Sequence, residues 1–113
     1  MQQIQKSIEC LYDVKVKDIG VSRLRMYGEE ALSLMIQEIK TSKNYQVREA
    51  LVPLIASIKK LEAIDALIEL TEDPDRLIGN IAHQNMKRIA RLPLSSIEWK
   101  TWWAKNRDTF KFN

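Results

Sequence analysis

The sequence predicts an all-α fold, and three observations support this prediction. Apolar residues recur at spacings of three and four along most of the 113-residue chain. Glycine and proline each occur only 3 times, whereas a β-sandwich or barrel needs a turn about every 8–12 residues. The chain also matches itself at an offset of 31 residues, as expected when a helical unit is repeated.

The composition is typical of a single globular domain. Apolar residues make up 45% and charged residues 29%, a balance that can bury a core without disulfides. A single cysteine, Cys10, excludes an internal disulfide and a multi-cysteine metal site. No apolar run approaches the roughly 18 residues needed to span a bilayer, and the first residues lack the apolar stretch of a secretory signal. We therefore expect a cytoplasmic protein without a membrane segment.

Four helices are expected in the first half of the chain, each marked by an apolar stripe at helical spacing. Gly20 interrupts the apolar pattern of the second helix, and Gly28 separates this helix from the third. The third opens with two glutamates, which suit a helix N-terminus, and Asn44 is placed to cap the fourth. The stripes are Ile4, Ile8 and Leu11; Val16, Ile19, Leu24 and Tyr27; Leu32, Met35, Ile36 and Ile39; and Val47, Leu51, Ile55 and Ile58.

Three more helices are expected in the second half. Asp73 and Asp75 are both candidates to cap the sixth helix, and Pro93 ends it because the residue before a proline disfavours the helical region. Ser95 and Glu98 form a capping box for the last helix, with Ser95 as its cap. The stripes are Ile64, Leu67, Ile68 and Leu70; Ile78, Ile81, Ala82, Met86 and Ile89; and Trp99, Trp102 and Trp103.

The 31-residue offset pairs turn with turn and stripe with stripe, so that Asn44 falls on Asp75. A third copy at the N-terminus is degenerate, because there Leu51 falls on Gly20. A helix pair cannot bury its stripe alone, so neighbouring pairs are expected to stack. We therefore divide a single domain, 1–113, into a degenerate repeat at 1–28, repeats at 29–60 and 61–92, and a capping helix at 94–107. The expected core includes Ile36, Leu51, Ile55, Leu67, Ile78 and Ile89.

Two segments resemble the HEAT-repeat family: Asn44-Tyr45-Gln46-Val47-Arg48-Glu49-Ala50-Leu51 and Asp73-Pro74-Asp75-Arg76-Leu77-Ile78. In that family a turn Asp or Asn precedes a Val-Arg pair and an Ala in the second helix of the repeat. Gly79 departs from this pattern, since it stands at the position matching Arg48. The Trp-rich segment 99–107 is similar to the end segment of some bacterial HEAT-repeat proteins. The resemblance implies a short right-handed α-solenoid of antiparallel helix pairs, about three repeats plus a capping helix.

For function, the resemblance implies a non-catalytic binding module or scaffold for a protein or peptide partner. The second helix of each HEAT repeat lines the concave side, which implies a polar partner-binding strip of Arg48, Asn80, His83, Gln84 and Lys87. We expect no enzyme activity, catalytic residue, metal site or cofactor, because no nucleophile motif or glycine-rich phosphate loop is present. The identity of the partner and the oligomeric state stay open.

The uneven charge of the chain favours an alternative, a nucleic-acid-binding protein. Residues 76–113 hold 8 Lys/Arg against 2 Asp/Glu, whereas residues 1–75 hold 10 against 13. Tryptophans within a basic groove stack single-stranded bases, and HEAT-type DNA glycosylases hold DNA on a related fold. The candidate nucleic-acid contacts are Lys100, Trp102, Lys105 and Arg107. The competing interpretation is that the tryptophans bury the end of the helical stack and that the last helix is a cap.

Overall fold

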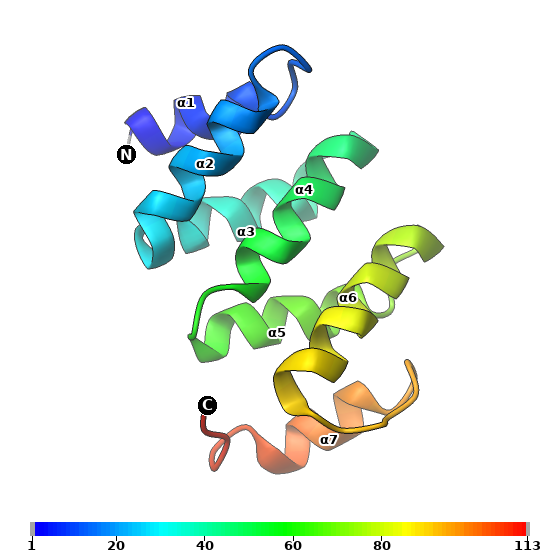
Figure 1. Cartoon of the computed structure of the whole chain (residues 1–113). Helices are drawn as coiled ribbons and strands as arrows, with labels where there is room; N and C mark the ends of the chain where they lie inside the picture. The colour runs from blue at the N-terminus through cyan, green and yellow to red at the C-terminus, as the bar shows by residue number, and fades with distance from the viewer. Residues whose placement is uncertain (1, 113) are drawn as a thin grey trace. The chain divides into compact units, whose positions relative to one another are not determined.

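The computed structural model describes residues 2–112, which are helical and contain no strand (Figure 1). The predicted all-α class is therefore confirmed for this part of the chain. The helices fall into two compact units that divide after Ile58. Among the described residues, none of the helices combines the length and the apolar content that crossing a bilayer requires.

The N-terminal unit, up to Ile58, contains four α-helices and a short 3-10 turn. They are α1 (Gln2–Cys10), α2 (Lys17–Tyr27), η1 (Gly28–Ala31), α3 (Leu32–Thr41) and α4 (Tyr45–Ala56). Within this unit α1 packs against α2, and α3 packs against α4. The two glutamates expected to open the third helix lie in η1, which begins at Gly28 with a positive φ of 60°. Glycine is suited to that backbone conformation because it has no Cβ atom to clash.

Gly20 lies inside α2, which continues through it. A Cβ atom at this position would lie 2.6 Å from the Ser7 carbonyl oxygen and 2.8 Å from the Cys10 Cβ atom. The glycine therefore serves the close approach of α1 to α2, a role that outweighs its low helix propensity.

One polar contact caps α4, and a second joins α4 to α3. The Asn44 side chain caps α4 by accepting a hydrogen bond from the Val47 backbone N–H at 3.1 Å. The Arg48 Nε donates to the carbonyl oxygen of Ile39, in the last turn of α3, at 2.9 Å. Ile36 is only half-buried, in contrast to the expectation, while the neighbouring positions Met35 and Ile39 are fully buried.

The C-terminal unit, from Lys59, contains α5 (Leu61–Leu70), α6 (Arg76–Ala90) and α7 (Trp99–Asn106). Both α6 and α7 contact α5. Of the two candidate caps, Asp75 caps α6 by accepting from the Leu77 N–H at 2.9 Å, and Asp73 accepts from the Asp75 N–H at 2.9 Å. The core of this unit contains Leu67 and Ile78 as expected, whereas Ile89 is half-buried.

The last helix is shorter than expected. It begins at Trp99, while Ser95 and Glu98 close one separate turn through a hydrogen bond from the Glu98 N–H to the Ser95 carbonyl. One half of the capping box is present, because the Ser95 N–H donates to the Glu98 carboxylate at 2.8 Å. The α7 residues Trp99 and Trp103 are 0% and 6% exposed. Two of the three tryptophans therefore belong to the core of this unit.

Candidate functional site

Helix α6 has one buried face and one polar, exposed face. Ile78 and Met86 are completely buried. Asn80, Gln84 and Lys87 are exposed, and their spacing of four and three residues places them on one side of the helix. These three members of the predicted strip are therefore accessible to a partner.

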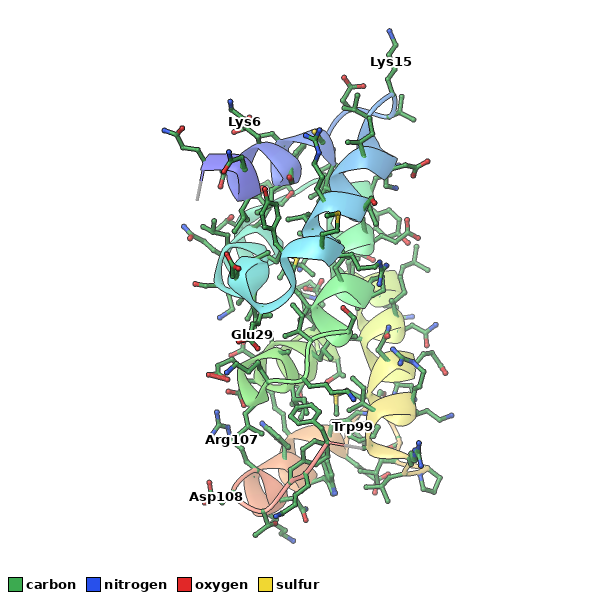
Figure 2. All side chains as sticks on the ribbon, turned by 60° about the vertical axis from the view of Figure 1, so that its left-hand side comes forward. Lys6, Lys15, Glu29, Trp99, Arg107 and Asp108 are labelled. Atoms are coloured by element: carbon green, nitrogen blue, oxygen red, sulfur yellow. The ribbon has the colours of Figure 1, made fainter. Side chains whose placement is uncertain are left out.

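His83, the fourth member of this strip on α6, is half-buried and held by Trp99. The Trp99 indole N–H donates to the His83 Nδ1 at 2.8 Å, and the two rings meet edge to face with centroids 6.1 Å apart. In Figure 2, Trp99 lies where the ribbons of α6 and α7 meet. An Nδ1 atom that accepts a hydrogen bond carries no proton, so the neutral ring bears its hydrogen on Nε2.

The pKa of His83 lies below its ordinary value of 6.5, chiefly because the ring is partly desolvated and to a lesser degree because Lys87 is nearby. The hydrogen bond from Trp99 also favours the neutral ring, because a protonated Nδ1 would face a second donor, the indole N–H. His83 is therefore an oriented hydrogen-bond donor through Nε2.

A cavity of about 240 Å³ opens beside the first half of α6. Arg76, Asn80 and His83 follow one another at spacings of four and three residues, so one stripe of α6 forms this wall. The other lining residues are Thr71, Asp73, Gly79 and Ser96, from the turn before α6, from α6 itself and from the turn before α7. Donor groups therefore dominate one wall of the cavity.

Arg48, the fifth residue of the predicted strip, belongs to the N-terminal unit. It is half-buried, and its Nε atom is engaged with the Ile39 carbonyl. Its role within that unit is to join α4 to α3, so the candidate site is described by its α6 members.

The four alternative nucleic-acid contacts lie in or directly after α7, and two of them are bound to carboxylates. Lys100 pairs with Glu72 at 2.9 Å, and Arg107 pairs with Asp65 at 2.8 Å. Half-buried Trp102 stacks on Trp103, with ring centroids 5.7 Å apart and an interplanar angle of 28°. The last of the four, Lys105, is exposed.

Asp65 is an important residue that the sequence did not single out. Its Oδ1 atom accepts from Trp103 Nε1 at 2.6 Å and from Arg107 Nε at 2.9 Å, and its Oδ2 accepts from Arg107 Nη2 at 2.8 Å. The Arg107 hydrogen bond is the main cause that lowers the pKa of Asp65, against the opposing effect of burial. Local pattern gave no signal for this contact, because the partners lie 38 and 42 residues away.

Phe110 and Phe112 extend the aromatic cluster beyond α7. Phe110 meets Trp102 and Trp103 edge to face at 5.9 and 5.5 Å, and Phe112 meets Phe110 at 5.1 Å. These contacts give the segment after α7 a packing role that its lack of helical pattern did not indicate.

Within residues 2–112, no group of three or more His, Cys, Asp or Glu side chains is placed to hold a metal ion. No family model, no curated protein and no solved structure matches this chain.

Proposed function

We propose that the protein is a non-catalytic binding module that presents helix α6 to a protein or peptide partner. The observation that carries this function is the two-sided construction of α6. Its buried face, with Ile78 and Met86, anchors the helix, while Asn80, Gln84 and Lys87 are exposed on the other side. A polar face on a well-packed helix offers hydrogen bonds and charge to a partner at little conformational cost.

A HEAT-like origin of the helix pairs is part of this interpretation. Asn44 and Asp75 are related by the 31-residue offset, and each caps the second helix of its pair, α4 and α6. Val47 and Ile78, also related by that offset, are both completely buried. The right-handed solenoid implied by the resemblance stays a prediction, as does a cytoplasmic location.

The nucleic-acid alternative has weaker support. Base stacking needs accessible rings, yet Trp99 and Trp103 are buried and use their indole N–H groups inside the unit. Lys100 and Arg107 already have carboxylate partners, so contact with phosphate would have to compete with Glu72 and Asp65.

The test is capture of partners by the immobilised full-length chain, followed by direct binding of each identified partner. Lys87→Glu reverses a charge on the exposed face of α6 and is expected to weaken direct binding about tenfold. Lys105→Glu makes the same change on exposed α7 and is the matched control, with an expected change within about twofold.

Equal effects of the two substitutions would contradict a site on α6. Binding of a single-stranded oligonucleotide that falls steeply with salt, and that Lys105→Glu weakens more than Lys87→Glu, would favour the nucleic-acid alternative.

A further inference from the structure

Helix α6 carries three of the eight basic residues of segment 76–113 and no acidic residue. The sequence Arg76–Ala90 contains no Asp or Glu, and it carries Arg76, Lys87 and Arg88. Arg88 donates to the neutral side chain of Asn85 at 2.7 Å, so this contact leaves its charge uncompensated. Because Lys100 and Arg107 are paired with carboxylates, α6 is where an acidic ligand gains most from the basic C-terminal region.

The cavity beside α6 supplies the donors that a carboxylate needs. Arg76, Asn80 and Ser96 line it, and the side chains of all three residues carry donor groups. His83 adds Nε2–H, because the Trp99 indole N–H occupies Nδ1. A carboxylate, with two oxygens that accept up to about four hydrogen bonds, matches this set.

Asp73 also lines the cavity and adds a carboxylate acceptor to it. It accepts a hydrogen bond from the Asp75 N–H and places its own negative charge at the cavity. A peptide also brings backbone N–H groups, which are donors for an aspartate acceptor.

We propose that this cavity binds a glutamate side chain of an acidic peptide segment that lies along α6; this inference rests on the proposed function. Arg76, Asn80, His83 and Lys87 form one continuous stripe on α6, with spacings of four, three and four residues. From Asn80 to Lys87 the helix rises about 10 Å, at roughly 1.5 Å per residue. A peptide in the polyproline II conformation covers that distance in about three residues, at roughly 3.1 Å per residue, and its three residues per turn place positions i and i+3 on the same side. The ligand is therefore a Glu-x-x-Glu segment, with one glutamate in the cavity and the other at Lys87.

The experiment measures fluorescence anisotropy of a labelled peptide that has blocked ends and one Glu-x-x-Glu pair. Arg76→Gln is expected to weaken binding about tenfold or more, since it removes a charged hydrogen-bond donor. Arg88→Gln is the matched control, because Arg88 lies on the same helix outside the cavity lining, and its expected effect is within about twofold. A backbone amide spectrum of each variant checks that the fold is retained, and Asn80→Ala serves as a second cavity variant.

Peptides with glutamine in place of either glutamate give the decisive comparison. The peptide that lacks the cavity glutamate should bind the wild-type chain and Arg76→Gln equally well. The peptide that lacks the other glutamate should bind the wild-type chain and Lys87→Gln equally well, so the pair of results identifies the glutamate in the cavity. Equal losses from Arg76→Gln and Arg88→Gln, or no saturable binding to the wild-type chain, overturn the cavity assignment. Arg76-dependent binding of an all-glutamine peptide with a free C-terminus overturns the side-chain assignment in favour of a terminal carboxylate.

Binding of an identified partner distinguishes failure of the cavity proposal from failure of the proposed binding surface on α6. If an identified partner loses binding with Lys87→Glu but binds normally to Arg76→Gln, the α6 surface is the site and the cavity does not take a carboxylate. If neither Lys87→Glu nor Arg76→Gln affects the partner, both proposals are wrong.

Discussion

Asp65 holds the end of the C-terminal unit in place through hydrogen bonds to Trp103 and Arg107. Arg107 contributes two parallel bonds, an arrangement that adds directionality to the charge attraction. The carboxylate is 41% exposed, so water screens much of this attraction. Its clearest consequence is therefore the pH dependence of unfolding.

Replacing Asp65 by Asn is expected to lower stability by about 1 kcal/mol, near the lower end for charged hydrogen bonds because of this exposure. The pKa of Asp65 is lowered in the folded chain from its ordinary value of 3.8. The stabilisation is therefore present above that value and is lost as the pH falls below it. Urea unfolding between neutral and acidic pH measures this, and the loss attributable to Asp65 should disappear in Asp65→Asn. An unchanged acid limb in the variant would assign the loss to other carboxylates.

The stability that His83 contributes is lost as the pH falls, which is the reverse of what is expected for a histidine whose protonated form the fold stabilises. Because its folded pKa lies below 6.5, the unfolded chain takes up the proton first as the pH falls. The contribution of neutral His83 is complete above 6.5 and declines as the pH drops through 6.5 toward the folded pKa. Protonation also removes the acceptor for Trp99. We expect His83→Gln, which keeps an acceptor but does not titrate, to flatten this part of the stability curve. The measurement is urea unfolding followed by tryptophan fluorescence.

Local signals in the sequence identified residues whose partners are close along the chain. Asn44 and Asp75 were both candidates for caps, and their side chains accept from backbone N–H groups three and two residues ahead. The contacts of Trp99 with His83 and of Trp103 with Asp65 span 16 and 38 residues. Such pairs depend on how helices pack, which a single sequence does not reveal without the fold.

At the scale of helices, the α1–α2 pair depends on one small residue. The periodic stripe predicted α1 and the burial of Ile4, Ile8 and Leu11, because one face of an amphipathic helix suffices for that inference. Gly20 interrupts the apolar pattern of α2, and glycine is a poor helix former. The close contact with Ser7 and Cys10 accounts for its presence.

Gly20→Ala is expected to destabilise the chain by about 1–3 kcal/mol, the usual cost of overpacking. The new methyl group would lie 2.6 Å from a backbone oxygen, so α1 and α2 must separate. Alanine's better helix propensity offsets only about 1 kcal/mol of that cost. Ser22→Ala, at an exposed position of the same helix, is the control and should be neutral or slightly stabilising. Chemical denaturation of both variants gives the comparison, and a stabilised Gly20→Ala chain would contradict the close approach.

Helix α7 shows where a capping pattern misleads. Ser95 and Glu98 do interact, but they close a separate turn, and the helical hydrogen bonds begin with the Trp102 N–H to the Glu98 carbonyl. The pattern thus placed the start of the structured segment correctly and the start of the helix too early. The backbone hydrogen bonds distinguish a capped helix start from a separate turn before the helix, whereas residue identities alone do not.

At the scale of the whole chain, the sequence showed that the basic residues gather after residue 75 but not which of them are neutralised. Lys100 and Arg107 find their partners in the acidic residues Glu72 and Asp65, which precede that point. Net charge along the sequence therefore did not distinguish α6 from α7 as the helix that attracts an acidic ligand. The ion pairs of Lys100 and Arg107 favour α6.

Removing everything after Leu92 tests whether the C-terminal segment completes the fold or only binds a ligand. Trp99 and Trp103 are 0% and 6% exposed. A buried indole removes about 150–250 Å² from water, so the pair contributes up to about 8–12 kcal/mol at roughly 25 cal/mol per Å². That upper limit is comparable to the entire stability of a typical domain, about 5–15 kcal/mol.

The chain cut after Leu92 should therefore aggregate or lose helix at a much lower temperature than the full chain. Thermal unfolding followed by circular dichroism, with size-exclusion chromatography, measures both outcomes. Ile97→Ala in the full chain is the control, because that side chain is 81% exposed and should leave the melting temperature nearly unchanged. If the tryptophans served mainly to stack nucleic-acid bases, the shortened chain would stay folded and monomeric and would lose only oligonucleotide binding. The two interpretations thus predict opposite melting behaviour for the same truncation, because only a buried indole is part of the folded core.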